Sequence, residues 1–112
     1  MATAKERNRR KMINEMVTRI VERFDPEKII LFGSHARGEA GPDSDVDLLI
    51  VMTVEGSKRE KQIEVRSALH DIRLSKDVII SRVEEFEWRK DIVGTIEHPA
   101  FREGEVLYAR DR

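Results

Sequence analysis

The chain has 112 residues, with 21 Lys and Arg against 22 Asp and Glu, so its formal net charge is −1 at pH 7. This length suits one small domain, and the balanced charge excludes a protein that coats nucleic acid through an excess of positive charge. The absence of Cys excludes disulfides, zinc fingers and iron–sulfur clusters, and no apolar run approaches the roughly 20 residues of a membrane span. We therefore expect a single domain over 1–112, located in the cytoplasm, with no membrane contact and no general nucleic-acid binding.

The first predicted element is a helix that ends before Pro26, a residue that cannot continue it. Its apolar residues recur at steps of three and four, which places them on one helix face: Ile13, Met16, Val17, Ile20, Val21 and Phe24. The basic residues at its start are interpreted as a solvent-facing surface: Lys5, Arg7, Arg9, Arg10 and Lys11.

Two predicted strands and a glycine-rich turn follow. Residues 28–32 are apolar and rich in Ile, as in a buried strand, and they lead directly into Gly33-Ser34-His35-Ala36-Arg37-Gly38. Residues 39–44 are expected to form a loop, and residues 45–52 a second strand whose acidic residues lie only in its first half.

The second half of the chain repeats the alternation of helix and strand. Ser57 and Glu60 have the spacing of a capping box, and an apolar stripe continues to Ile72, which predicts a helix. Residues 77–81 predict a third strand that begins with an acid, followed by a helical stretch that contains Phe86 and Trp88. We expect a further helix within 92–101, capped by Gly104, and a short last strand at 106–108.

Asp45 and Asp47 stand two residues apart on the second strand, so both side chains should project from one face. Adjacent carboxylates raise each other's pKa, whereas a divalent cation between them favours both ionised forms. Because all-oxygen ligands select a hard ion, Mg²⁺ or Mn²⁺ is expected in preference to zinc.

Asp77 would join this pair if its strand lies beside the second strand in the same direction. Three acids at one end of a sheet suit phosphate chemistry with two metal ions. Gly33 and Ser34 supply the complementary part, because a glycine backbone, N–H groups and a hydroxyl can hold phosphate oxygens, and Arg37 lies within reach to add charge.

Taken singly, each of these features also has a purely structural explanation, as a turn or a surface strand. Other motifs fail on specific residues. Gly33 to Gly38 has the glycine spacing of a P-loop, but Glu39-Ala40 replace the required Lys and Ser or Thr. The start of an EF-hand loop around Asp45 is excluded because Leu48 replaces its glycine. The three histidines lack the spacing of zinc ligands and are interpreted as ordinary residues: His35, His70 and His98.

The joint order of the motifs resembles a known family. Gly33-Ser34, ten intervening residues and Asp45-Val46-Asp47-Leu48, with a later strand that begins at Asp77, are similar to the nucleotidyltransferases of the DNA polymerase beta superfamily, in particular the minimal MNT type. The match is strongest over residues 28–50, and residues 101–108 also resemble the family's ending.

The resemblance implies transfer of a nucleoside monophosphate, most simply AMP from ATP, to a hydroxyl with release of pyrophosphate. Asp45 and Asp47 would bind two Mg²⁺ ions, Asp77 would complete the site, and Gly33, Ser34 and Arg37 would hold phosphates. Minimal members commonly act as antitoxins that adenylylate a small helical toxin of the HEPN type, so such a partner is expected. Self-association into a homo-oligomer is left open.

Two other functions remain open at this stage. The first is a binding module, an antitoxin that blocks its partner by contact without catalysis. A tail-adding or aminoglycoside-modifying transferase would share the chemistry but needs a second domain for its substrate. For the fold we expect the α/β class: a small mixed sheet of three or four strands, with helices largely on one face and the acids at one open edge.

Overall fold

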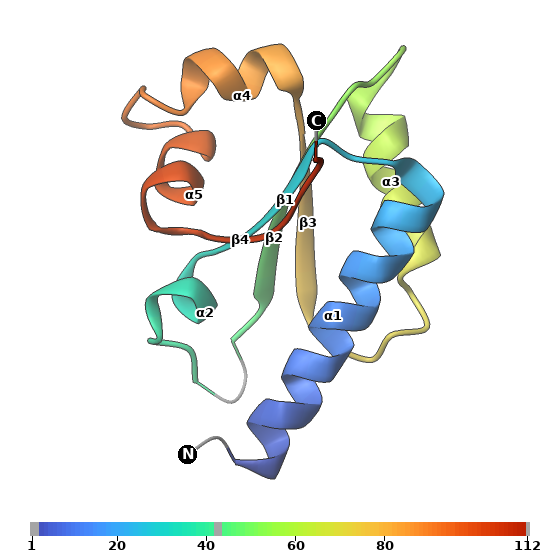
Figure 1. Ribbon diagram of the computed structural model, residues 1–112, viewed down its shortest axis with the longest axis vertical. Coiled ribbons are helices and arrows are strands. Elements are labelled where there is room, and N and C mark those ends of the chain that lie inside the picture. Colours follow the sequence, from blue (N-terminus) through green and yellow to red (C-terminus); the bar gives the residue numbers. More distant parts are fainter. Residues whose placement is uncertain (1–2, 42–43, 112) are drawn as a thin grey trace.

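The computed structural model describes residues 3–41 and 44–111, which form one four-stranded sheet with helices around it (Figure 1). The elements follow in chain order: α1 (Ala4–Phe24), β1 (Lys28–Phe32), α2 (Ser34–Arg37), β2 (Val46–Met52), α3 (Lys58–Ala68), β3 (Lys76–Arg82), α4 (Val83–Arg89), α5 (Glu97–Glu103) and β4 (Glu105–Ala109). This confirms the α/β class and the mixed sheet.

The strand order is β3-β2-β1-β4, with β1 antiparallel to both β2 and β4. β2 and β3 are parallel, and α3 forms the connection between them. The parallel pairing is the one on which the expected cluster of acids depends, because it brings the beginnings of β2 and β3 to the same end of the sheet.

The two long helices α1 and α3 cover one face of the sheet (Figure 1). α1 ends as predicted, with Asp25 in the left-handed conformation at φ 47° and Pro26 after it. α3 begins where the Ser57 hydroxyl accepts a hydrogen bond from the Glu60 N–H at 3.1 Å. Alternate residues of the strands pack against these helices in what we call the larger core, which includes Met16, Ile20, Leu48, Ile50, Val65, Leu69, Val78 and Ile80.

The short helices α4 and α5 lie on the opposite face, so the sheet is covered on both sides (Figure 1). They add a smaller core of Ile30, Leu49, Val51, Phe86 and Ala100. The expectation of helices largely on one face therefore holds only for the two long helices, because α4 and α5 cover the other face. β2 is buried on both faces, which explains why its sequence is continuously apolar after Asp47.

Several element boundaries differ from the sequence expectations, among them that β3 begins at Lys76 and β4 at Glu105, each one residue earlier than expected. α3 ends at Ala68 and not near Ile72, although Leu69 and Ile72 remain buried in the larger core through the turns that follow. A helix over all of 92–101 was wrong, because residues 90–96 form turns in which Gly94 has φ 100°, and α5 begins only at Glu97. β2 begins one residue after Asp45.

Within the described ranges 3–41 and 44–111, none of the helices combines the length and the apolar character that crossing a membrane requires.

Replacing Gly104 by Ala should destabilise the fold by about 1–3 kcal/mol, the usual cost of overpacking. Gly104 does follow α5, but its φ of −75° is ordinary, and it is needed for space: an added Cβ would lie 2.2 Å from the Ala100 carbonyl oxygen and 2.5 Å from Ile30 Cγ2. Denaturant unfolding would measure the loss. Gly41→Ala is the matched control, because the nearest described atom to its Cβ would be Ser44 Oγ at 3.9 Å. Equal losses in the two variants would contradict this explanation.

Candidate active site

The parallel register places Asp47 of β2 directly beside Asp77 of β3. Asp45 precedes β2 by one residue, and its side chain is exposed while Val46 is buried in the larger core. Asp47 alternates with Val46 and Leu48, so it lies on the face of the sheet that carries the smaller core. The sheet thus brings together the three acids that the sequence selected.

The pKa of Asp47 is raised above its ordinary value. Partial burial is the main cause, and the neighbouring carboxylates of Asp77 and then Asp45 add to it, while the positive charges of His35 and Arg37 act in the opposite direction. The environment therefore disfavours the ionised form of Asp47 relative to its protonated form.

The other two carboxylates each accept a hydrogen bond from a neighbouring side chain. The Ser75 hydroxyl donates to Asp45, and Arg66 of α3 donates to Asp77 Oδ1 at 2.9 Å. With these contacts, no group of three acidic, His or Cys side chains within 3–41 and 44–111 is arranged as a set of metal ligands. The backbone register brings the three acids to one end of the sheet, while the side chains of Asp45 and Asp77 are bonded to Ser75 and Arg66. Their role as a metal set stays a prediction.

Gly33 lies between β1 and α2 and directly against Asp47. Its φ of 74° and ψ of −154° belong to a region that only glycine readily adopts. A Cβ at this position would lie 2.4 Å from Asp47 Oδ2. Ser34 begins α2, and Gly38 ends it with its N–H bonded to the Ser34 carbonyl oxygen. The expected phosphate-binding turn therefore lies directly against Asp47.

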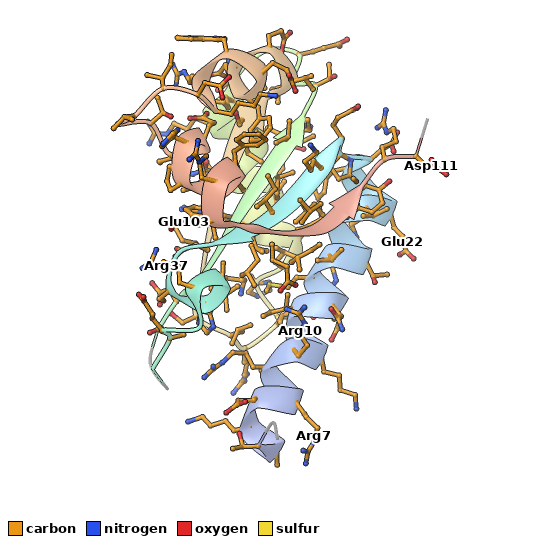
Figure 2. The ribbon with its side chains drawn as sticks, turned by 60° about the vertical axis from the view of Figure 1, so that its left-hand side comes forward. Arg7, Arg10, Glu22, Arg37, Glu103 and Asp111 are labelled. Carbon is orange, nitrogen blue, oxygen red and sulfur yellow. The ribbon has the colours of Figure 1, made fainter. Side chains whose placement is uncertain are left out.

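Arg37 is held at the side of this surface by two glutamates. Its Nε donates to Glu39 at 3.0 Å, and Nη1 lies 3.7 Å from Glu103 at the end of α5, next to it in Figure 2. The hydrogen bond that Arg37 donates to Glu39 is the main reason that the pKa of Arg37 is raised. A role of Arg37 in phosphate binding stays a prediction.

Sequence reasoning missed three residues that support the site. Arg66 and Ser75 bond to Asp77 and Asp45, and His35 Nε2 lies 3.0 Å from the Ser44 carbonyl oxygen, which ties α2 to the segment just before Asp45. The sequence signal for Ser75 was its place two residues before Asp77. Arg66 and His35 carry no such signal, because their contacts depend on how α3 and α2 pack.

A family model described as "Polymerase beta, Nucleotidyltransferase" matches residues 14–112. The chain belongs to this nucleotidyltransferase family. It is 33% identical over 105 residues to a protein of Methanocaldococcus jannaschii named "Putative protein adenylyltransferase", covering 90% of this chain and 99% of that one. A second protein of the same organism and name is 39% identical over 57 residues, 51% of this chain and 57% of that one.

Solved structures show the same fold. The crystal structure of a "putative nucleotidyltransferase" from Sulfolobus solfataricus matches with a TM-score of 0.63 and 26% identity, over 89% of this chain and 79% of that one. A "toxin-antitoxin with AMP-PNP" matches with a TM-score of 0.55 and 17% identity, over 87% and 73% of the two chains, which shows the fold alone.

Gly33→Ala should reduce nucleotidyl transfer by roughly 100-fold, the effect of moving a reacting group by about 1 Å, because its Cβ would displace the Asp47 carboxylate. Gly38→Ala is the matched control: it has the same φ of 74°, but no described atom lies within 4 Å of its Cβ. Its cost should be limited to backbone strain of about 1–2 kcal/mol. Comparable loss of transfer in two folded variants would contradict a specific contact between Gly33 and Asp47.

Asp47→Asn should stabilise the fold at neutral pH in the absence of divalent cations. A carboxyl whose folded pKa is raised binds its proton more tightly in the folded state, so stability falls as pH rises from the ordinary value of 3.8 through the folded pKa. Asn removes this loss. Thermal unfolding from pH 3 to 8 should show a higher Tm for the variant that is largest at high pH and vanishes at low pH; a lower Tm for Asp47→Asn at pH 7 would refute it.

Proposed function

We propose that this protein transfers AMP from ATP to a hydroxyl group of a partner protein. The observation that carries the proposal is the parallel register of Asp47 and Asp77 beside the Gly33–Ser34 turn. The adenylyltransferase names of two relatives favour ATP as donor and a protein as acceptor.

In the proposed reaction the acceptor oxygen forms a bond to the α-phosphorus of ATP. The bond from that phosphorus to the oxygen bridging to the β-phosphate breaks, and pyrophosphate leaves with the electron pair. Gly33 and Ser34 would hold the β- and γ-phosphates, and Asp77 would accept the hydroxyl proton. Arg66, bonded to Asp77 Oδ1, would position this carboxylate.

The donor set fits Mg²⁺, with Mn²⁺ as an alternative. Asp45, Asp47 and Asp77 offer only oxygen. The pKa of Asp47 is raised by burial first and then by the neighbouring carboxylates, and a cation would compensate the charge of those carboxylates. Asp45 and Asp47 would hold two ions, with Asp77 as a further ligand. When bound, such ions activate the attacking hydroxyl and neutralise charge on the phosphates.

The proposed acceptor is a small helical toxin of the HEPN type, for which this protein would act as the antitoxin. The family resemblance is the support for this partner. A second candidate function is a contact-only antitoxin without catalysis. In that candidate the bonds of Asp45 to Ser75 and of Asp77 to Arg66 would be purely structural contacts.

The deciding measurement is the intact mass of a small helical protein of the HEPN type, the proposed acceptor, after incubation with this protein, ATP and Mg²⁺. We expect one or more adenylate increments, because the three acids lie beside a turn suited to phosphates. Asp45→Asn with Asp47→Asn should abolish the increments, since Asn cannot supply the charge that holds the ions.

Omission of Mg²⁺ is the second control and should also leave the mass unchanged. No increment with any of the four nucleoside triphosphates, together with a stable complex of the two proteins, would replace the transferase proposal by the contact-only function.

A further inference from the structure

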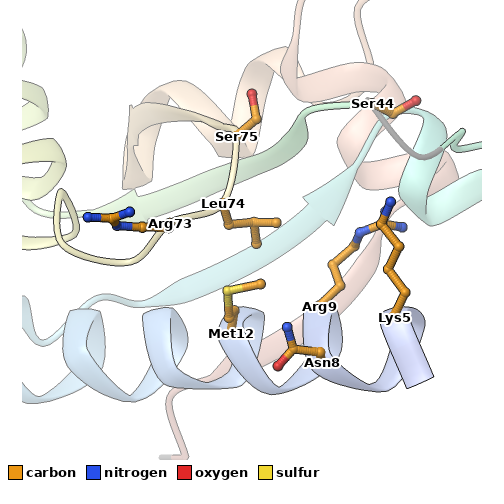
Figure 3. Close-up of a pocket in the computed structure, with 8 residues that line it drawn as sticks. All are labelled: Lys5, Asn8, Arg9, Met12, Ser44, Arg73, Leu74 and Ser75. Carbon is orange, nitrogen blue, oxygen red and sulfur yellow. The ribbon is translucent and has the colours of Figure 1, made fainter. Parts of the chain in front are cut away.

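A hollow of about 430 Å³ lies between the N-terminal half of α1 and the segment that leads into β3 (Figure 3). Figure 3 shows Met12 of α1 and Leu74 pointing toward one another, while Lys5 and Arg9 extend from α1 toward Ser44. Arg73 lies at the other end of the hollow. The lining therefore combines an apolar centre with polar and basic ends.

The charge of this lining departs from that of the chain. Lys5, Arg9 and Arg73 carry positive charge, and its remaining members are neutral: Asn8, Met12, Ser44, Leu74 and Ser75. No acidic side chain lines it among the described residues, whereas the whole chain has a net charge of −1. Positive charge concentrated around an apolar centre suits a ligand that carries both carboxylates and an apolar or aromatic group.

This basic hollow lies next to the acids. A second hollow, of about 570 Å³, shares Leu74 and Ser75 with it and is lined by Asp45 and Asp77 together with the basic side chains of Arg66, His70 and Lys76. The Ser75 hydroxyl, which lines both, donates to Asp45. An extended segment that lies in the basic hollow and continues past Ser75 therefore reaches the site of nucleotidyl transfer.

We propose that the basic hollow docks an acidic segment of the acceptor polypeptide and presents its hydroxyl to Asp45 and Asp77. This inference rests on the proposed function and names how that function recognises its acceptor. The negative acids repel carboxylates while Lys5 and Arg73 attract them, so the charge pattern fixes which part of the segment lies in the hollow.

Two other occupants fit less well. The triphosphate of ATP belongs with Gly33 and Ser34, which do not line the basic hollow. A nucleic-acid strand carries a charge at every nucleotide, whereas the second hollow mixes Asp45 and Asp77 with basic side chains, so it suits a continuous row of phosphates only in part. A short polypeptide can place its carboxylates in the basic part alone.

The test uses a fluorescent copolymer of Glu and Tyr, which supplies both carboxylates and hydroxyls, and measures its binding by anisotropy without ATP. Lys5→Glu with Arg73→Glu should weaken binding about tenfold or more, the sum of two exposed charge contacts each turned from attraction to repulsion. Lys11→Glu with Arg59→Glu is the matched control, since both residues are exposed and neither lines the hollow. It should bind like the unaltered protein.

Several results would overturn the docking proposal. These are no binding of the copolymer, equal weakening in both double variants, or tighter binding of a single-stranded DNA of equal charge than of the copolymer. Circular dichroism confirms folding, and Lys5→Gln with Arg73→Gln replaces the reversal variant if that variant unfolds.

Transfer of AMP to the copolymer is measured separately, which distinguishes the two proposals. Binding through the hollow without transfer by the unaltered protein would refute the transferase function on this acceptor and retain the docking site. Transfer that Lys5→Glu with Arg73→Glu leaves unchanged would retain the function and refute the docking site.

Discussion

The parallel pairing of β2 with β3 is the constraint on which the site depends, because it holds Asp47 and Asp77 side by side. Partial burial disfavours the ionised form of Asp47, and the neighbouring negative charge of Asp77 disfavours it further. The connection through α3 that makes the strands parallel also supplies Arg66, whose bond to Asp77 partly offsets that repulsion. The same topology thus brings the acids together and supplies Arg66, a positive charge that stabilises one of them.

The antiparallel neighbour β1 imposes the second constraint. Phe32 pairs with Asp47, so the next residue must pass directly against the Asp47 carboxylate. Only a residue without a Cβ fits there, and only glycine readily adopts the φ and ψ of Gly33. The pairing of β1 with β2 therefore places the Gly33–Ser34 turn, which suits phosphates, beside the carboxylate of Asp47, which suits a metal ion.

The sequence was sufficient for those parts of the fold that depend on local pattern. The apolar stripe of α1, its end at Pro26 and the Ser57 cap of α3 were predicted because periodicity and capping act within a few residues. The turns at 90–96 were missed because glycine is also tolerated inside helices, so the sequence did not show that Gly94 would end one here. The acids were selected by spacing, but the bonds of Asp45 and Asp77 to Ser75 and Arg66 depend on side-chain packing across elements, which spacing does not encode.

Acidic and basic side chains line two neighbouring hollows at this end of the sheet. The acids lie on one side, while α1 brings Lys5 and Arg9 to the other, and residues 74–75 connect the two hollows. The basic surface of α1 is largely exposed, as interpreted from the sequence, but Lys5 and Arg9 also line the hollow. Spacing alone could not show this, because it depends on how α1 packs beside the segment before β3. An acidic centre attracts cations but repels the anionic substrates of phosphate chemistry, so a basic surface beside it provides the attraction that an anionic acceptor would otherwise lack.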